Sequence, residues 1–137
     1  MNVAMMLKYK DEVAYMNCED SISKALELMS QHSYTAVPVI NSEGLYVGSV
    51  SEGDFLWATL KNDRSKYDEI PIKNILRDGF IKPVNIDADM GEVLLLTMEQ
   101  NFVPVIDSRK CFVGIVTRRD VISYFYNLTK DKEKETQ

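Results

Sequence analysis

The stretch VPVINSEGLYVGSVSEGD spans Val37 to Asp54, and VPVIDSRKCFVGIVTRRD spans Val103 to Asp120. The two stretches lie sixty-six residues apart, and nine of their eighteen aligned positions are identical without a gap. Most of the other positions hold conservative pairs, such as Ser51 with Thr117. Self-similarity at a fixed offset is the signature of a duplicated structural unit. We therefore predict a fold that is built twice.

The similarity extends upstream of these stretches, with a two-residue slip. VAYMNCEDSI from Val13 aligns with IKPVNIDADM from Ile81, and each is a short apolar run before an acidic cap region. The duplicated unit then covers nearly the whole chain. We predict a first repeat at 1–62, a linker with a short helix at 63–78, a second repeat at 79–130 and a polar tail at 131–137 that frays.

Each repeat predicts the same element order, strand–helix–strand–strand–helix, which makes the fold class α+β. Apolar residues at helical spacing follow Ser21 and Asp89, which are expected to cap a helix. Pro38 and Pro104 lie in β-branched runs, and each should mark a strand start, an edge or a bulge, because proline cannot donate to a ladder. The expected strands are 35–40, 45–50, 102–106 and 112–116, and the expected helices are 22–32, 54–60, 90–100 and 120–126.

Composition and charge exclude several classes of function. No run reaches the roughly eighteen apolar residues of a membrane span, and the N-terminus lacks a secretory leader, so we expect a cytoplasmic protein without membrane contact. The net charge of −5 does not favour binding to nucleic acid, which is a polyanion. Cys18 and Cys111 are far apart and His32 is the only histidine, which predicts buried thiols, no metal site and no His-based triad.

The turn that is built twice, GSVSEGD and GIVTRRD, carries the candidate chemistry. A hydroxyl residue followed three places later by an acid, Ser51 with Asp54 and Thr117 with Asp120, is a capping-box pattern at a helix start. The free N–H groups of a helix N-terminus also attract anions. An aspartate can accept hydrogen bonds from the two neighbouring hydroxyls of a ribose. On the residues alone, the helix cap and the ligand site both stay open.

The doubled unit, its VPV strands and its two turns resemble a tandem pair of CBS domains, also called a Bateman module, over about 13–128. The resemblance implies two repeats related by a pseudo-twofold axis, with two clefts between them that bind adenosine ligands. In this family the aspartate holds ribose, the segment before the proline holds adenine, and basic residues near the turn meet phosphate. Each cleft combines the pre-proline segment of one repeat with the turn of the other.

Carried onto this chain, the resemblance implies two nucleotide-binding clefts. Cleft A would consist of Val13, Ala14, Tyr34, Thr35, Ala36, Thr117, Arg118, Arg119 and Asp120. Cleft B would consist of Ile81, Lys82, Asn101, Phe102, Ser51 and Asp54.

The two clefts differ in their charge and in the space that they leave for a base. Arg118 and Arg119 suit bidentate phosphate contacts in cleft A, where Ala36 leaves space for a purine. Cations at a helix N-terminus oppose the helix dipole, so local stability does not explain these arginines. In cleft B, Glu52 stands in place of Arg118 and repels an anion. Phe102 replaces the small alanine there and either stacks on a base or fills the pocket, with filling favoured.

The function favoured by these residues is a non-catalytic regulatory sensor that binds an adenine nucleotide and signals to an unidentified regulated protein. The candidate ligands are AMP, ADP, ATP and cyclic di-AMP, since stand-alone bacterial pairs similar to this one, including its YTAVPV stretch, are cyclic di-AMP receptors. A structural or interaction module with empty clefts is the alternative. No metal-ligand cluster, Cys/His pair or P-loop pattern points to an enzyme, and no cofactor besides the regulatory nucleotide is expected.

An apolar stripe on the last helix of each repeat predicts a homodimer, because a twofold contact would bury such a stripe. Core packing explains the same residues without a dimer. The stripe consists of Phe55, Leu56, Trp57, Val121, Ile122, Tyr124 and Phe125.

Overall fold

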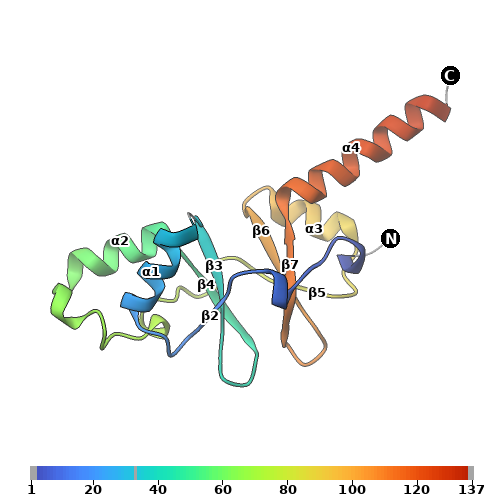
Figure 1. Ribbon diagram of the computed structural model, residues 1–137. Helices are drawn as coiled ribbons and strands as arrows, with labels where there is room; N and C mark the ends of the chain where they lie inside the picture. The colour runs from blue at the N-terminus through green and yellow to red at the C-terminus, as the bar shows by residue number, and fades with distance from the viewer. Residues whose placement is uncertain (1–2, 33, 136–137) are drawn as a thin grey trace. The chain divides into compact units, whose positions relative to one another are not determined.

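The computed structural model describes residues 3–32 and 34–135, and its elements follow the predicted order twice (Figure 1). The first repeat consists of β2 (Met16–Asn17), α1 (Ile22–His32), β3 (Ala36–Ile40), β4 (Tyr46–Ser51) and α2 (Glu52–Lys61). The second repeat consists of β5 (Val84–Asn85), α3 (Met90–Thr97), β6 (Phe102–Ile106), β7 (Phe112–Thr117) and α4 (Arg118–Glu135). The mixed α and β fold class is therefore confirmed, while the pseudo-twofold relation of the repeats stays a prediction.

The chain forms two compact units, and each contains most of one repeat. The first-repeat unit contains Ala14–Phe80 together with Arg109–Phe112. The second-repeat unit contains the described residues up to Val13, residues 81–108 and the described residues from Val113 onward. The segment 3–13 thus packs in the second-repeat unit. The family boundaries of the repeats stay predictions.

The first-repeat unit is built on a three-stranded sheet in the order β2-β3-β4. β3 and β4 form the antiparallel hairpin, and β2 pairs parallel with Val39 and Ile40 alone. On the β2 side, β3 is consequently an edge at Pro38, where the missing N–H breaks no ladder. This confirms the expected edge position of the proline. The apolar face of α1 buries Ile22 and Ala25 against the β-branched residues of this sheet.

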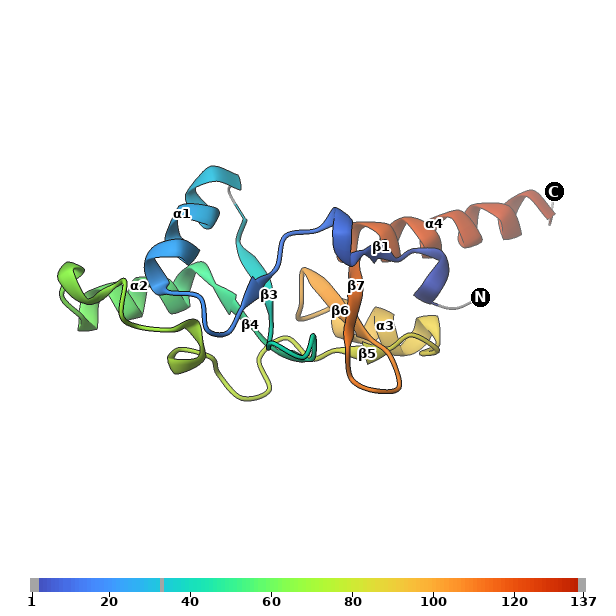
Figure 2. The same cartoon turned by 60° about the horizontal axis from the view of Figure 1, so that its bottom comes forward.

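The second-repeat unit has a fourth strand that the sequence did not predict. β1 (Lys8–Tyr9) pairs antiparallel with β7, which gives the sheet order β1-β7-β6-β5 (Figure 2). The segment before β1 adds the fully buried Val3 to the core of this unit. Gly114 faces β1 in the register, and a Cβ at that glycine would collide with the carbonyl oxygen of Lys8. The close approach of β1 therefore depends on a residue without a side chain.

The linker between the repeats docks onto the first-repeat unit. It contains two 3₁₀ turns, η3 (Arg64–Lys66) and η4 (Ile72–Asn74), and Ile72 is fully buried. The Ile72 N–H donates to the carbonyl of Asp20 at 2.9 Å, and the Lys73 N–H donates to the carbonyl of Cys18 at 3.0 Å. Where the sequence predicted a short docked helix, the linker therefore contains a single docked 3₁₀ turn, η4.

The last helix is longer than its predicted span of 120–126. α4 runs from Arg118 to Glu135 and extends past α3 (Figure 1). The polar stretch that was expected to follow as a tail is therefore helical as far as Glu135, since alternating lysine and acidic residues are good helix formers. Within the described part of the chain, no helix is both long and apolar enough to cross a membrane.

The predicted apolar stripe divides between the core and the surface. Phe55 and Val121 are buried in the cores of their units, so core packing explains them. Leu56, Trp57 and Ile122 remain mostly exposed.

Candidate functional site

The first turn forms a complete capping box at the start of α2. The Asp54 N–H donates to Ser51 Oγ at 3.3 Å, and the Ser51 N–H donates to Asp54 Oδ2 at 2.8 Å. The Ser51 hydroxyl also contacts Asp54 Oδ2 at 3.0 Å. The helix-cap interpretation of this motif is therefore confirmed for the first repeat.

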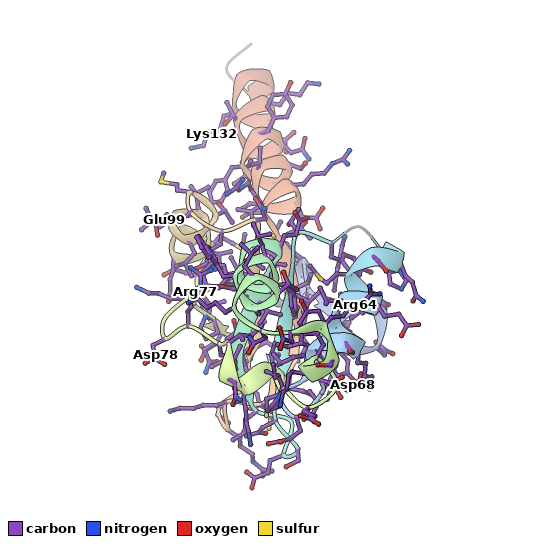
Figure 3. The ribbon with its side chains drawn as sticks, turned by 90° about the vertical axis from the view of Figure 1, so that its left-hand side faces the viewer. Arg64, Asp68, Arg77, Asp78, Glu99 and Lys132 are labelled. Atoms are coloured by element: carbon purple, nitrogen blue, oxygen red, sulfur yellow. The ribbon has the colours of Figure 1, made fainter. Side chains whose placement is uncertain are left out.

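Asp54 also forms an ion pair that the sequence did not predict. Its partner is Arg77, which is labelled in Figure 3. Arg77 Nε lies 2.7 Å from Asp54 Oδ1, and Arg77 Nη2 lies 3.4 Å from Asp54 Oδ2. The Arg77 guanidinium stacks on the ring of Phe80, at 3.8 Å from the ring centre. The Asp54 side chain is only 7% exposed. Because the linker occurs once, comparing the chain with itself gives no signal for Arg77.

The second turn also lies at the start of a helix, α4, but its aspartate side chain does not complete a capping box. Thr117 Oγ1 accepts a hydrogen bond from the Asp120 N–H at 3.2 Å, as expected for a helix cap. The Asp120 carboxylate is partly exposed and accepts no hydrogen bond within residues 3–32 and 34–135. The predicted capping box is thus only half formed in the second repeat.

Equivalent backbone hydrogen bonds hold both turns in place. The Glu52 N–H donates to the carbonyl of Thr35 at 3.0 Å, and the Arg118 N–H donates to the carbonyl of Asn101 at 2.9 Å. These two bonds occupy matching positions in the two repeats, at the offset of sixty-six residues. The different surroundings of the two aspartates therefore do not come from a different backbone arrangement at the turn.

The two arginines of the second turn have different roles. Arg118 Nε donates to the carbonyl of Thr97 at 2.7 Å, and that carbonyl belongs to the last turn of α3. The expectation that local stability does not explain these arginines is therefore wrong for Arg118, which satisfies a carbonyl at a helix C-terminus. Arg119 is exposed and makes no ion pair or hydrogen bond within the described residues.

The pre-proline segment of the first repeat lies beside its own turn. Ala36 pairs with Ser51 in the β3–β4 ladder. Tyr34 is about one-third exposed, and its ring stacks on His32 at 5.3 Å between ring centres. Val13 is partly buried in the second-repeat unit, and Ala14 packs on the core of the first-repeat unit.

The matching segment of the second repeat is held by a glutamine that the sequence did not single out. Gln100 is buried, accepts from the Lys82 N–H at 2.8 Å and donates to the Lys82 carbonyl at 3.1 Å. Ile81 has a φ of 56°, a strained conformation for a β-branched residue. Phe102 is buried, which favours the filling role over stacking on a base.

The described residues hold no group of three or more His, Cys, Asp or Glu side chains that could bind a metal ion. Cys18 and Cys111 form no disulfide within the described residues, and both are partly exposed. The prediction that they are buried is therefore wrong. Cys18 lies just past β2, and Cys111 lies one residue before β7, so neither occupies a strand interior.

The comparison with protein families decides the family. The CBS-domain model matches residues 6–61 and 69–127, which are the two repeats described above. The chain belongs to the CBS-domain family. Within each unit of this CBS pair, the structure brings the pre-proline segment next to the turn of the same repeat. The pairing of segments from different repeats, which clefts A and B require, stays a prediction.

Curated relatives of this CBS pair are larger proteins. The uncharacterized protein MJ1404 of Methanocaldococcus jannaschii is 31% identical over 131 residues, which are 86% of this chain and 31% of that protein. The chain thus spans about a third or less of the length of the curated relatives that it matches.

Solved structures share the fold over nearly the whole chain. CbpB in complex with c-di-AMP has a TM-score of 0.87 at 23% identity, covering 98% of this chain and 91% of that chain. Listeria monocytogenes CbpB, also in complex with c-di-AMP, has a TM-score of 0.78 at 25% identity and covers 93% and 97%. CBSX2 in complex with AMP has a TM-score of 0.73 at 23% identity and covers 93% and 98%.

Proposed function

We propose that this CBS pair is a non-catalytic regulatory module that binds an adenine nucleotide, with Asp120 as the ribose-binding carboxylate. The observation that carries the proposal is the difference between two aspartates in the same motif. The Asp54 carboxylate accepts hydrogen bonds from the capping box and pairs with Arg77. The Asp120 carboxylate is partly exposed and accepts no hydrogen bond from the described residues. Helix capping therefore accounts for Asp54 and leaves Asp120 unexplained.

The surroundings of Asp120 suit a nucleotide. Its two carboxylate oxygens can accept hydrogen bonds from the 2′- and 3′-hydroxyls of a ribose, which are two donors side by side. The N-terminus of α4 adds partial positive charge. Arg119, on the preceding residue, is exposed and available for a phosphate. In this proposal Arg118 mainly holds the start of α4 against α3, and its remaining N–H groups assist.

The class of ligand is supported by the proteins with the same fold. CbpB is seen with c-di-AMP and CBSX2 with AMP, so an adenine base linked to ribose and phosphate is their shared chemistry. AMP and cyclic di-AMP are therefore the first ligands to test, followed by ADP and ATP. We further propose that the bound nucleotide changes the interaction with a regulated protein. We also place the module in the cytoplasm, as the sequence predicts.

Binding to ligand-stripped protein tests the proposal. Equilibrium dialysis would compare AMP and cyclic di-AMP with GMP, and thermal denaturation would follow the same ligands. A nucleotide that binds only the folded state should raise the apparent stability by about 2.7 kcal/mol at a hundredfold excess over its Kd. Binding of the adenine nucleotides but not of GMP supports the proposal. Failure of every adenine nucleotide to bind would favour the interaction module with empty clefts.

A further inference from the structure

We propose that Arg77 is an internal counter-ion that closes the first repeat to ribose, so that one chain binds nucleotide through Asp120 alone. This inference rests on the proposed function, because it concerns which of the two motif carboxylates accepts the ligand. Its starting point is the 2.7 Å ion pair between Arg77 Nε and Asp54 Oδ1.

Most acceptor sites of the Asp54 carboxylate are already used. Oδ2 faces the Ser51 N–H at 2.8 Å, the Ser51 hydroxyl at 3.0 Å and Arg77 Nη2 at 3.4 Å, while Oδ1 faces Arg77 Nε at 2.7 Å. A carboxylate oxygen has about two lone-pair sites, so Oδ2 is fully used and Oδ1 keeps one. The two hydroxyls of a ribose would need two sites. Removal of the Arg77 contacts would leave the capping box at the start of α2 intact.

Lack of space does not explain why Asp54 would be closed. A hollow of about 480 Å³ lies beside the ion pair, with Asp54, Arg77 and Trp57 among its walls. That volume falls within the range of about 300–1,000 Å³ that is typical of small-molecule pockets. The ion pair with Arg77, and not a lack of space, therefore distinguishes Asp54 from Asp120.

The path of the chain explains why only the first repeat has this counter-ion. After α2 the linker turns back through η3 and η4, and the buried Ile72 anchors it to the first-repeat unit. Arg77 then follows five residues later and reaches the first turn of α2. After Asp120, by contrast, α4 continues as one helix to Glu135, so the residues that follow the second turn lead away from it.

The Arg77 guanidinium is held in place but remains replaceable. The ring of Phe80 supports it at 3.8 Å, while the Arg77 side chain is still 54% exposed. Removal of this side chain would expose an Asp54 carboxylate that keeps its capping-box bonds. The first repeat should then offer the two acceptor sites of Asp54 Oδ1 to a ribose, while Oδ2 keeps capping-box bonds that Asp120 does not make.

A gain of binding in an inactivated background tests the proposal. AMP binding would be measured by isothermal titration for wild type, Asp120→Asn, Asp120→Asn with Arg77→Ala, and the same double variant with Asp54→Asn. Asp120→Asn should lose most of the affinity. Adding Arg77→Ala should restore binding to at least about tenfold above Asp120→Asn, and adding Asp54→Asn should abolish that gain.

Lys73→Ala in the Asp120→Asn background is the matched control. Lys73 lies on the same linker and forms an exposed ion pair with Glu19 at 2.9 Å, so its removal deletes a linker cation without uncovering Asp54. This control should give no gain. Arg77→Gln serves as a second variant that keeps most of the side chain, in case Arg77→Ala does not fold. Circular dichroism and melting curves establish folding for every variant.

The outcomes separate this proposal from the proposed function. Two AMP sites per wild-type chain, or no gain in folded Arg77 variants while wild type binds through Asp120, would overturn the role of Arg77 alone. A wild type without AMP binding, combined with Asp54-dependent binding in Arg77→Ala, would overturn the role of Asp120 and keep that of Arg77. Absence of binding in all folded variants would overturn both. Adenosine, titrated in parallel, separates loss of a phosphate contact from gain of a ribose contact.

Discussion

Asp54 and Asp120 occupy one position in two copies of a motif, yet their carboxylates have different neighbours. Asp54 is almost fully buried between a serine N-cap and an arginine. Asp120 lies in the first turn of α4, partly exposed and with its backbone N–H donating to Thr117 Oγ1. A carboxylate that is fully hydrogen bonded within the chain gains little by meeting a ligand, since it must first give up those bonds. The neighbours therefore decide which copy can act on a nucleotide.

Arg119→Ala should weaken AMP binding much more than adenosine binding. The expected loss for AMP is on the order of 1.5–3 kcal/mol, because a charged hydrogen bond to phosphate disappears. Arg118→Ala should instead lower the melting temperature, since the carbonyl of Thr97 loses its partner at 2.7 Å. Isothermal titration with both ligands, and melting curves without ligand, measure the two effects.

High salt is the control for the arginine prediction. Screening weakens an exposed ion pair, so the difference between wild type and Arg119→Ala should shrink as salt is raised. Equal losses for AMP and adenosine would show that Arg119 is a solvated charge and not a phosphate contact.

Sequence reasoning found the residues of the turns but not their partners. Ser51, Asp54, Thr117 and Asp120 were identifiable because duplication preserved their spacing. Arg77 was not, because its contact with Asp54 joins residues that are twenty-three positions apart through a linker with no second copy. The hydrogen bond from Arg118 to the last turn of α3 could not be predicted either, because it depends on the position of that helix end in the folded unit.

At the level of elements, the repeated order of strands and helices was predictable from hydrophobic periodicity. α1 begins and ends at the predicted residues, because apolar spacing and the Ser21 cap agree there. β1 was not predictable, since Lys8 and Tyr9 are two exposed residues without strand periodicity. Only the tertiary approach to Gly114 makes them a strand.

Gly114→Ala should destabilise the protein more than Gly48→Ala, by more than about 2 kcal/mol. Both glycines have a positive φ, 158° and 149°, so the backbone strain is similar. At Gly114 the new methyl group would collide with the carbonyl of Lys8, which is backbone and must move as part of β1. At Gly48 it would meet Leu76 Cδ2 at 3.3 Å, which is the flexible end of a side chain. Urea denaturation gives both free energies of unfolding.

Equal destabilisation by the two alanines would contradict the importance of β1. Deletion of the residues before β1 offers an independent check, because it removes the buried Val3 from the core of the second-repeat unit. That deletion should lower the stability and make the Gly114→Ala effect smaller, since the two changes act on the same contact.

At the scale of the whole molecule, the predicted homodimer remains to be tested. Three large apolar side chains on α2, Leu56, Trp57 and Leu60, are 57%, 63% and 69% exposed. Contiguous exposed apolar residues of this size favour a protein contact. Sedimentation equilibrium on the order of tens of micromolar should give a dimer for wild type and a smaller species for Trp57→Asp.

Met98→Asp is the matched control for the dimer. Met98 is 73% exposed but lies at the end of α3, away from the stripe in the sequence. This variant should keep the mass of wild type. A monomeric wild type would contradict the prediction, and the exposed residues of α2 would then need another partner.

In the proposed function, Asp120 and not Asp54 binds the nucleotide. Isothermal titration of AMP into wild type, Asp120→Asn and Asp54→Asn, all shown to be folded, tests it most directly. We expect one AMP per wild-type chain, a loss on the order of 1.5–3 kcal/mol for Asp120→Asn and nearly unchanged affinity for Asp54→Asn. Equal losses in the two variants, or a larger loss for Asp54→Asn, would contradict it.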